Sequence, residues 1–353
     1  MLFLWKRPKI IIVAGKGRAL AAEAIFQVLK QKFKVEKITG ENFSFLWNEI
    51  LIFETKLEKI ENLHFFVKNS KAPIFLITNV GEIPPDKYFF AGARKETEKM
   101  RKLIRILPPS ARLVLNFDDE TIRELGDDSN IPALTFGFQE GVDLRASDLH
   151  FNHGINFKIN YKGNVVPVWL DSLYGKEQIY GVLAAVVCGV IFDFNLVEVS
   201  QALKFYKGLP GKMRLMKGIK NSWLLDDSAT SSVFSMIEAL EILGKIEIGQ
   251  KKKIAVLGDI LGIGKYTIEA HEVIGEKVAK SANLLFTIGS RAKFIAQGAK
   301  NNGFPEESIF QFDDTGRMLS ALKTEIKEKD LVLIDGSTEI RMDQIVQEIQ
   351  ARG

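Results

Sequence analysis

The sequence predicts an α/β protein in which a domain of P-loop type is followed by a Rossmann-like domain. Two observations predict this fold class. Short apolar runs that end in polar residues alternate with segments of helical periodicity, which is typical of parallel sheets covered by helices. The pattern also restarts at "GLPGK", where glycine and proline flank a short loop. We therefore expect one domain over residues 1–208 and a second over residues 209–353.

Composition limits the classes of partner. The chain has 353 residues, 46% of them hydrophobic, which is enough to bury two cores. Its formal charge of +4 is small and its basic residues are spread among acidic ones, so we expect no nucleic-acid partner. The single cysteine, Cys188, lies in an apolar run and indicates an inert core thiol in a reducing compartment. No run is long enough for a signal peptide or a membrane span, so we expect a cytoplasmic protein.

The first predicted strand, Ile10 to Val13, leads through "AGKGR" into a helix. A glycine loop at a helix amino end can hold phosphate on its backbone N–H groups. A P-loop also needs lysine followed by serine or threonine, whereas Gly17 is followed here by Arg18 and Ala19. Arg18 can pair with phosphate, but Ala19 cannot bind a metal. A phosphate site and a tight turn of an ordinary doubly wound fold both explain the loop.

Further apolar runs in the first domain end at the same predicted sheet edge. One run ends at Glu54, another at Thr78-Asn79, and a third is followed by "NFDDE". Between them, a helix places Met100, Leu103, Ile104 and Leu107 on one face, and its Lys99 reads as a solvated charge. Residues 133–169 predict β-hairpins at the edge of the domain. That region contains His150 and His153, which we interpret as surface residues because no further metal ligands accompany them.

The second half begins with a nearly all-apolar helix at "IYGVLAAVVCGVIF" and a further helix near residues 196–205. Strands then start at Trp223, Ile254, Leu284 and Leu331, with helices between them, which predicts a parallel Rossmann-like sheet. Two of these strands end in acids, in "DDS" at 226–228 and "GD" at 258–259, so this edge is a candidate ligand site. No dinucleotide fingerprint follows the first strand, which disfavours a nicotinamide enzyme.

Several of these segments, in this order, resemble the motifs of the Mur ligases. They are "RPKIIIVAGKGRALAAEAIFQVL", "LIFE", "FLITNVG", "LVLNFDDE", "GKEQIYGVLAAVVCGVIF", "LPGKMRL", "LLDDSATSS", "VLGDILGIGKYTIEAH" and "LIDGSTEIRMDQIV". The resemblance covers nearly the whole chain and is greatest to the branch of the family that adds D-alanyl-D-alanine to a cell-wall precursor. It implies ATP-dependent joining of a carboxylate to an amine through an acyl phosphate, with Mg²⁺ neutralising charge, in peptidoglycan precursor synthesis.

The resemblance also implies roles for residues of the first domain. Gly15, Gly17 and Arg18 would surround the phosphates of ATP, with Asn79 at the same cofactor site, and Glu54 would bind Mg²⁺. Glu54 and Lys99 would share the catalytic and metal-binding role. Lys99 aligns with the lysine that the family carbamylates to hold a second metal, and a shift of one residue would place Met100 there instead.

In the second domain, Lys212 takes the place of an arginine that contacts the nucleotide in the family, and Asp227 matches the acid expected to bind the ribose hydroxyls. Ser337, Arg341 and the turn at 258–259 would face the amino-acid substrate or the cleft between the domains.

The sequence departs from the family pattern at catalytic positions. The loop is one residue short, Arg18 replaces its lysine, and Ala19 replaces its metal-binding hydroxyl. Ala229-Thr230 stands where the family has Tyr-Asn, and Gly262 stands where it has an acid. These losses predict weakened or absent catalysis, because each such group is worth roughly a hundredfold in rate.

The chain also begins almost at its first strand, so the family's uridine-nucleotide domain would come from another polypeptide or be dispensed with. Three hypotheses follow. One is a ligase in which Arg18 replaces lysine, the second a non-catalytic nucleotide- or partner-binding module, and the third an unrelated nucleotide-dependent enzyme.

Overall fold

A computed structural model describes residues 8–38, 48–55, 63–70, 72–79, 98, 100–127, 129–229 and 232–351. The chain forms two compact units. Unit 1 comprises Met1–His150, Asn156–Leu170 and Lys176–Lys207, and unit 2 comprises Phe151–Ile155, Asp171–Gly175 and Gly208–Gly353. One short piece of the predicted hairpin region, Phe151–Ile155, and the segment Asp171–Gly175 just beyond that region therefore group with the second half of the chain. Among the described residues, no helix combines the length and apolarity that crossing a bilayer requires.

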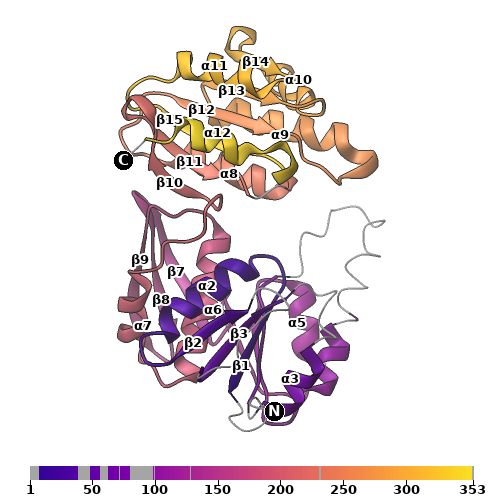
Figure 1. The fold of residues 1–353 in the computed structure, drawn as a ribbon, viewed down its shortest axis with the longest axis vertical. Helices are drawn as coiled ribbons and strands as arrows, with labels where there is room; N and C mark the ends of the chain where they lie inside the picture. The colour runs from indigo at the N-terminus through magenta and orange to yellow at the C-terminus, as the bar shows by residue number, and fades with distance from the viewer. Residues whose placement is uncertain are drawn as a thin grey trace. The chain divides into compact units, whose positions relative to one another are not determined.

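Unit 1 is built on a nine-stranded sheet of order β2-β3-β1-β4-β5-β6-β7-β8-β9 (Figure 1). Neighbouring strands from β2 to β7 are parallel, so the strand ends predicted to share an edge do share it. The strands are β1 (Lys9–Ala14), β2 (Val35–Ile38), β3 (Ile50–Glu54), β4 (Ile74–Ile77), β5 (Arg112–Asn116), β6 (Ala133–Gly137), β7 (Leu144–Phe151), β8 (Gly154–Tyr161) and β9 (Asn164–Asp171).

Helices cover both faces of this sheet. Figure 1 shows α2 and α6 on one side and α3 and α5 on the other. The predicted apolar face of the helical segment at 100–106 is confirmed, because Met100, Leu103 and Ile104 are buried in a core with β1 and β5. Cys188 of α6 is completely buried, and this burial raises the pKa of its thiol, as expected of an inert core cysteine. The helices are α2 (Arg18–Leu29), α3 (His64–Asn69), α5 (Glu120–Asp127), α6 (Lys176–Ile191) and α7 (Leu196–Leu203).

The region predicted as hairpins is only partly so. Its first strand, β6, is parallel to β5 and to β7, and therefore extends the parallel sheet. The hairpin arrangement begins at β7, where β7-β8 and β8-β9 are sheet neighbours joined by two-residue turns. The prediction was wrong for β6 because a five-residue apolar strand has no periodicity that distinguishes parallel from antiparallel pairing. The helix α5 connects β5 to β6, and a helical crossover of this kind allows the two strands to run parallel.

Unit 2 has a six-stranded sheet of order β10-β11-β15-β12-β13-β14. Its four predicted strands are confirmed and pair in parallel with one another. The two edge strands were not predicted: β10 pairs with β11 in antiparallel orientation, and β14 pairs with β13 in parallel. The strands are β10 (Arg214–Lys217), β11 (Trp223–Asp227), β12 (Lys253–Gly258), β13 (Leu284–Ile288), β14 (Ile309–Phe312) and β15 (Leu331–Asp335).

Two apolar cores, one on each face, bury the sheet of unit 2. One lies beneath α8, α9 and α10, and the other beneath α11 and α12. Alternate residues of β15 enter opposite cores, so the two faces are set by the strand period of two. The helices are α8 (Val233–Lys245), α9 (Thr267–Ser281), α10 (Lys293–Asn301), α11 (Thr315–Glu325) and α12 (Met342–Ile349).

The contact between α9 and α10 depends on two glycines. A Cβ at Gly275 would overlap the carbonyl oxygen of Ile295, and one at Gly298 would overlap that of Glu272. We predict that Gly275→Ala lowers the free energy of unfolding by about 3 kcal/mol, because backbone cannot move aside as a side chain can. Gly316→Ala, at a helical glycine of α11 with more space, should change it by less than about 1 kcal/mol. Urea unfolding of both variants tests this, and equal effects would contradict it.

Candidate functional site

Residues 15–18 connect β1 to α2 in unit 1, and we call them the phosphate loop after the role that the sequence leads us to expect. Gly15 has φ 101° and Gly17 has φ 76°, and glycine is the residue that adopts both at little cost. A Cβ on Gly15 would overlap the backbone of Asn79, so the loop lies directly against the end of β4. The Lys16 backbone N–H donates to the Asn79 carbonyl at 2.7 Å. The tight turn expected from the sequence is therefore present, and β4 holds it in place.

Two side chains on neighbouring strands hold this turn. The Thr78 hydroxyl lies within hydrogen-bond reach of two loop carbonyls, donating to Ala14 at 3.1 Å and also contacting that of Lys16. The Asn116 amide, at the end of β5, donates to the Thr78 carbonyl at 2.7 Å. Thr78 and Asn79, directly after β4, therefore hold the backbone of the loop, and Asn116 holds the backbone of Thr78. Asn79, expected at the cofactor site, contributes its carbonyl to the loop, and its contact with a cofactor stays a prediction.

Arg18 begins α2 and forms an ion pair with Glu54 at the end of the adjacent strand β3. The distance from Arg18 Nε to Glu54 Oε1 is 3.4 Å, and Arg18 Nη1 donates to the Gly15 carbonyl at 3.3 Å. The structure thus brings together Gly15, Gly17, Arg18 and Glu54, as the sequence comparison implied. It also gives the Glu54 carboxylate a cation from within the chain.

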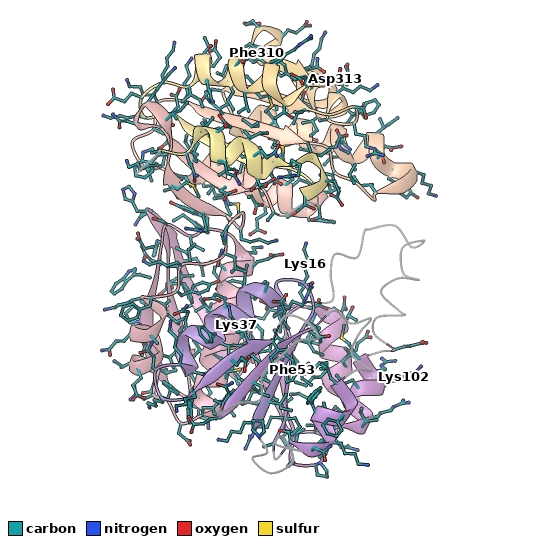
Figure 2. The ribbon with its side chains drawn as sticks, viewed as in Figure 1. Lys16, Lys37, Phe53, Lys102, Phe310 and Asp313 are labelled. Carbon is teal, nitrogen blue, oxygen red and sulfur yellow. The ribbon has the colours of Figure 1, made fainter. Side chains whose placement is uncertain are left out.

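Lys16 was not singled out from the sequence, although a lysine between two loop glycines is a signal for phosphate contact. Its side chain extends from the loop ahead of α2 (Figure 2). The ammonium lies 3.9 Å from Glu177, in the first turn of α6, and about a third of the side chain is exposed. Both groups are partly solvated, so an anion can compete with this weak ion pair.

The donor set for Mg²⁺ at this loop is sparse. Among the residues that the structure describes, no group of three or more histidine, cysteine or acidic side chains is arranged to hold a metal. Glu54 is the acid at the phosphate loop that the family comparison assigns to metal, and it pairs with Arg18. Lys99, the other assigned metal and catalytic residue, lies outside the described residues. The described residues therefore fit an anion better than a divalent cation.

In unit 2, the acids at the end of β11 hold a loop by its backbone. Asp226 Oδ2 accepts from the Gly211 N–H at 2.9 Å, and Asp227 Oδ1 accepts from the Met213 N–H at 3.2 Å. Lys212 lies between these two anchored residues. Asp227, expected to bind the ribose hydroxyls, is only 3% exposed, and that role stays a prediction.

The residues that follow β12 are hydrogen-bonded to two neighbouring segments of unit 2. The Asp259 carboxylate accepts the backbone N–H groups of Arg291, at 2.9 Å, and Ala292, at 2.7 Å, ahead of α10. The Ser337 hydroxyl accepts the Leu261 N–H at 3.0 Å. The acids that the sequence placed at this edge therefore lie together, and each has a backbone partner.

His271 on α9 supports the same turn. Its Nε2 accepts the Ile260 N–H at 3.2 Å, so the proton is assigned to Nδ1, which faces the Thr267 carbonyl at 2.6 Å. Burial lowers the pKa of this imidazole, in agreement with a neutral ring. Arg341 pairs with Asp343 at 3.1 Å, and its expected contact with a substrate stays a prediction. Gly262, where the family has an acid, is exposed and has φ 82°.

We predict that acid destabilises unit 2 through His271. A folded-state pKa below the unfolded value of 6.5 means that the unfolded chain binds the proton first. The stabilising contribution is present above pH 6.5 and is lost as pH falls toward the folded-state pKa, by about 1.4 kcal/mol per unit of pKa difference. His271→Gln should flatten this slope in denaturant unfolding at a series of pH values. His153→Gln, at an exposed histidine, should retain it, and an unchanged slope in His271→Gln would contradict the assignment.

These features define a class: a phosphate-loop α/β domain followed by a parallel Rossmann-like domain. Comparison with known families agrees with it. The Mur ligase middle domain matches residues 39–189, and the Mur ligase glutamate ligase domain matches residues 211–338. Since the two matches cover most of the chain, the protein belongs to the Mur ligase family. The resemblance drawn from the sequence motifs is confirmed, as is the fold class.

Within the family, the chain is most similar to the ligases that add D-alanyl-D-alanine. The UDP-N-acetylmuramoyl-tripeptide--D-alanyl-D-alanine ligase of Bacillus subtilis (strain 168) is 25% identical over 97% of this chain and 76% of that protein. The ligase of the same name from Synechocystis sp. is 24% identical over 98% of this chain and 75% of that protein. The chain therefore spans about three quarters of the length of these relatives.

Solved structures share the fold at lower identity. A MurF ligase from Thermotoga maritima, in complex with ADP, matches with a TM-score of 0.77 at 19% identity, covering 98% of this chain and 80% of that one. MurF from Acinetobacter baumannii matches with a TM-score of 0.82 at 16% identity, covering 98% and 77%. At these sequence identities, the comparison with the solved structures shows a shared fold and nothing more.

Proposed function

We propose that this protein is a Mur ligase-family protein of peptidoglycan precursor synthesis, of the ATP-dependent class that adds D-alanyl-D-alanine, in which catalysis is weakened or lost. The observation that carries the proposal is the Arg18–Glu54 ion pair at 3.4 Å. It puts a guanidinium against the acid that the family comparison assigns to metal. A cation ligand that is already paired with a guanidinium is a poor Mg²⁺ ligand, because a second cation meets both repulsion and competition.

Nucleotide binding is retained in this proposal. The amino end of α2, the positive φ of Gly17 and the side chains of Lys16 and Arg18 are a combination suited to phosphate. The Gly17 cap has no side-chain hydrogen bond that would compete with an anion at the helix end. When bound, ATP would supply the phosphoryl group that activates a carboxylate. The residues of this chain hold and neutralise the phosphate chain, and Arg18 provides part of the charge that Mg²⁺ would otherwise carry.

The substrates remain proposals drawn from the relatives. A muramyl-peptide precursor and D-alanyl-D-alanine are the candidates, since these appear in the names of the similar ligases. The alternative function is a non-catalytic module that binds a nucleotide or a protein partner on the same body. ATP binding with no substrate-dependent ADP release at all would favour this module, whereas slow substrate-dependent release would favour a weakened ligase.

Calorimetry and a turnover assay separate these outcomes. We expect ATP to bind the full chain, with little or no ADP release in the presence of Mg²⁺, UDP-N-acetylmuramoyl tripeptide and D-alanyl-D-alanine. Substrate-dependent ADP release at the rate of an ordinary enzyme, near 10 s⁻¹, would overturn the loss of catalysis. No detectable ATP binding would overturn the nucleotide site itself. A companion variant, Arg18→Lys with Ala19→Thr, restores the lysine and hydroxyl and should raise ATP affinity.

A single substitution tests the phosphate loop. We predict that Lys16→Met raises the Kd for ATP by about tenfold, because one charge-assisted contact is worth roughly 1.4 kcal/mol or more. Lys30→Met is the matched control, since Lys30 lies at the opposite end of α2 and interacts with the Phe26 ring. Isothermal titration calorimetry measures both. Equal Kd values for the two variants would show that Lys16 does not contact the nucleotide.

A further inference from the structure

The two cations of the phosphate loop are each paired with an acid of the same unit. Arg18 Nε lies 3.4 Å from Glu54 Oε1, and the guanidinium also donates to the Gly15 carbonyl. Lys16 Nζ lies 3.9 Å from Glu177 Oε1. The charges of these four side chains therefore cancel within the chain, although the backbone of the loop is suited to an anion.

The two ion pairs differ in how firmly they are held. The Arg18 guanidinium contacts both a carboxylate and a loop carbonyl, whereas the Lys16 and Glu177 charges lie beyond hydrogen-bond distance of each other. The Lys16 and Glu177 side chains are also 32% and 29% exposed, and partly solvated pairs of this kind contribute little to stability. Lys16 is therefore the loop cation that an incoming anion can most easily take over.

The packing of α6 on α2 places Glu177 against the loop. A Cβ on Gly17 would lie 3.9 Å from the carboxyl carbon of Glu177. Further along both helices, a Cβ on Gly181 would lie 3.2 Å from backbone atoms of Leu20 and Ala21. Because these contacts advance together along the two helices, α2 and α6 run parallel, on the same side of the sheet (Figure 1). Their amino ends therefore lie together beside the loop.

The surroundings of the Glu177 carboxylate favour negative charge. Glu177 lies in the first turn of α6, and Gly17 caps the amino end of α2. Each helix carries partial positive charge at its amino end, and the Lys16 ammonium adds a full charge. These are the groups that would stabilise a phosphate at the loop. The carboxylate is therefore an internal anion next to the place that the proposed function gives to phosphate.

We propose that Glu177 is a positioning residue for Lys16, an internal anion that holds the ammonium beside the loop and gives it up when phosphate binds. The inference rests on the proposed function, in which the loop holds the phosphate chain of a nucleotide. Exchanging one anion for another keeps Lys16 paired throughout, so the loop never encloses an uncompensated charge. The consequence is a lower affinity, because displacing the carboxylate consumes part of the binding free energy.

Neutralising Glu177 separates this role from a structural one. We expect Glu177→Gln to lower the Kd for inorganic pyrophosphate about fivefold, because the Lys16 ammonium no longer has to leave a carboxylate. A carboxylate that only stabilises the loop predicts the opposite sign, since its loss would loosen the loop and weaken binding. Isothermal titration calorimetry of the full chain, without Mg²⁺, measures the change. An unchanged or higher Kd would overturn the inference and leave the phosphate site standing.

Glu198→Gln is the matched control. Glu198 also lies in the first turn of a helix, α7, and pairs with a lysine, Lys32, at 2.8 Å. Lys32 follows the carboxyl end of α2, so this pair lies away from the loop. The substitution removes the same charge from the chain and should leave the Kd for pyrophosphate unchanged. An equal fall in Kd for both variants would reflect the overall charge alone and would contradict the role given to Glu177.

A double-mutant cycle tests whether Glu177 acts through Lys16. In a Lys16→Met background, Glu177→Gln should change the Kd for pyrophosphate by less than about twofold, because no ammonium remains to be released. A full fivefold effect in that background would mean direct repulsion between Glu177 and the ligand, and would overturn the positioning role.

Pyrophosphate probes the loop of unit 1 without requiring a whole nucleotide site. If neither the wild-type chain nor Glu177→Gln binds pyrophosphate, the inference and the phosphate site both fail. If pyrophosphate binds with the expected response to Glu177→Gln but ATP does not bind, the proposed nucleotide is overturned and the positioning of Lys16 by Glu177 stands.

Discussion

Loops that cross the carboxyl ends of parallel strands need partners for their backbone groups, and this constraint organises both units of the protein. In unit 1, Thr78 and Asn79, directly after β4, bond to backbone groups of the phosphate loop. The Thr78 hydroxyl contacts the Lys16 carbonyl, and the Asn79 carbonyl accepts the Lys16 N–H. In unit 2, Asp226 and Asp227 do the same for the loop that carries Lys212. Without these bonds, neither loop would have a fixed path, because positive-φ glycines alone favour no single conformation.

This constraint separates two kinds of motif residue. Residues that hold the loops are constrained by the fold, since a change would leave buried backbone groups without partners. Residues that would contact the ligand are less constrained by the fold. Arg18 illustrates this, because its guanidinium satisfies both Glu54 and the Gly15 carbonyl within the chain. In the proposed function, the Mur ligase fold is therefore kept while its catalytic chemistry is weakened or lost.

Much of the fold was predictable because the signals are local. The strand ending at Glu54, the helix face of Met100 and Leu103, and the four parallel strands of unit 2 all follow from apolar periodicity. The edge strands β2, β10 and β14 and the parallel pairing of β6 were missed. Pairing with other strands settles these features, and none of them carries a local signal.

The sequence by itself determined the two α/β domains, the glycine loop and the acids at the strand ends, because these depend on periodicity and on residue type. Only the tertiary structure decided what those groups contact. It paired Arg18 with Glu54, gave Asp226 and Asp227 to backbone N–H groups, and buried Asp335 at the end of β15. These outcomes depend on strand order and burial, which bring together residues far apart in the chain and set the cost of each charge.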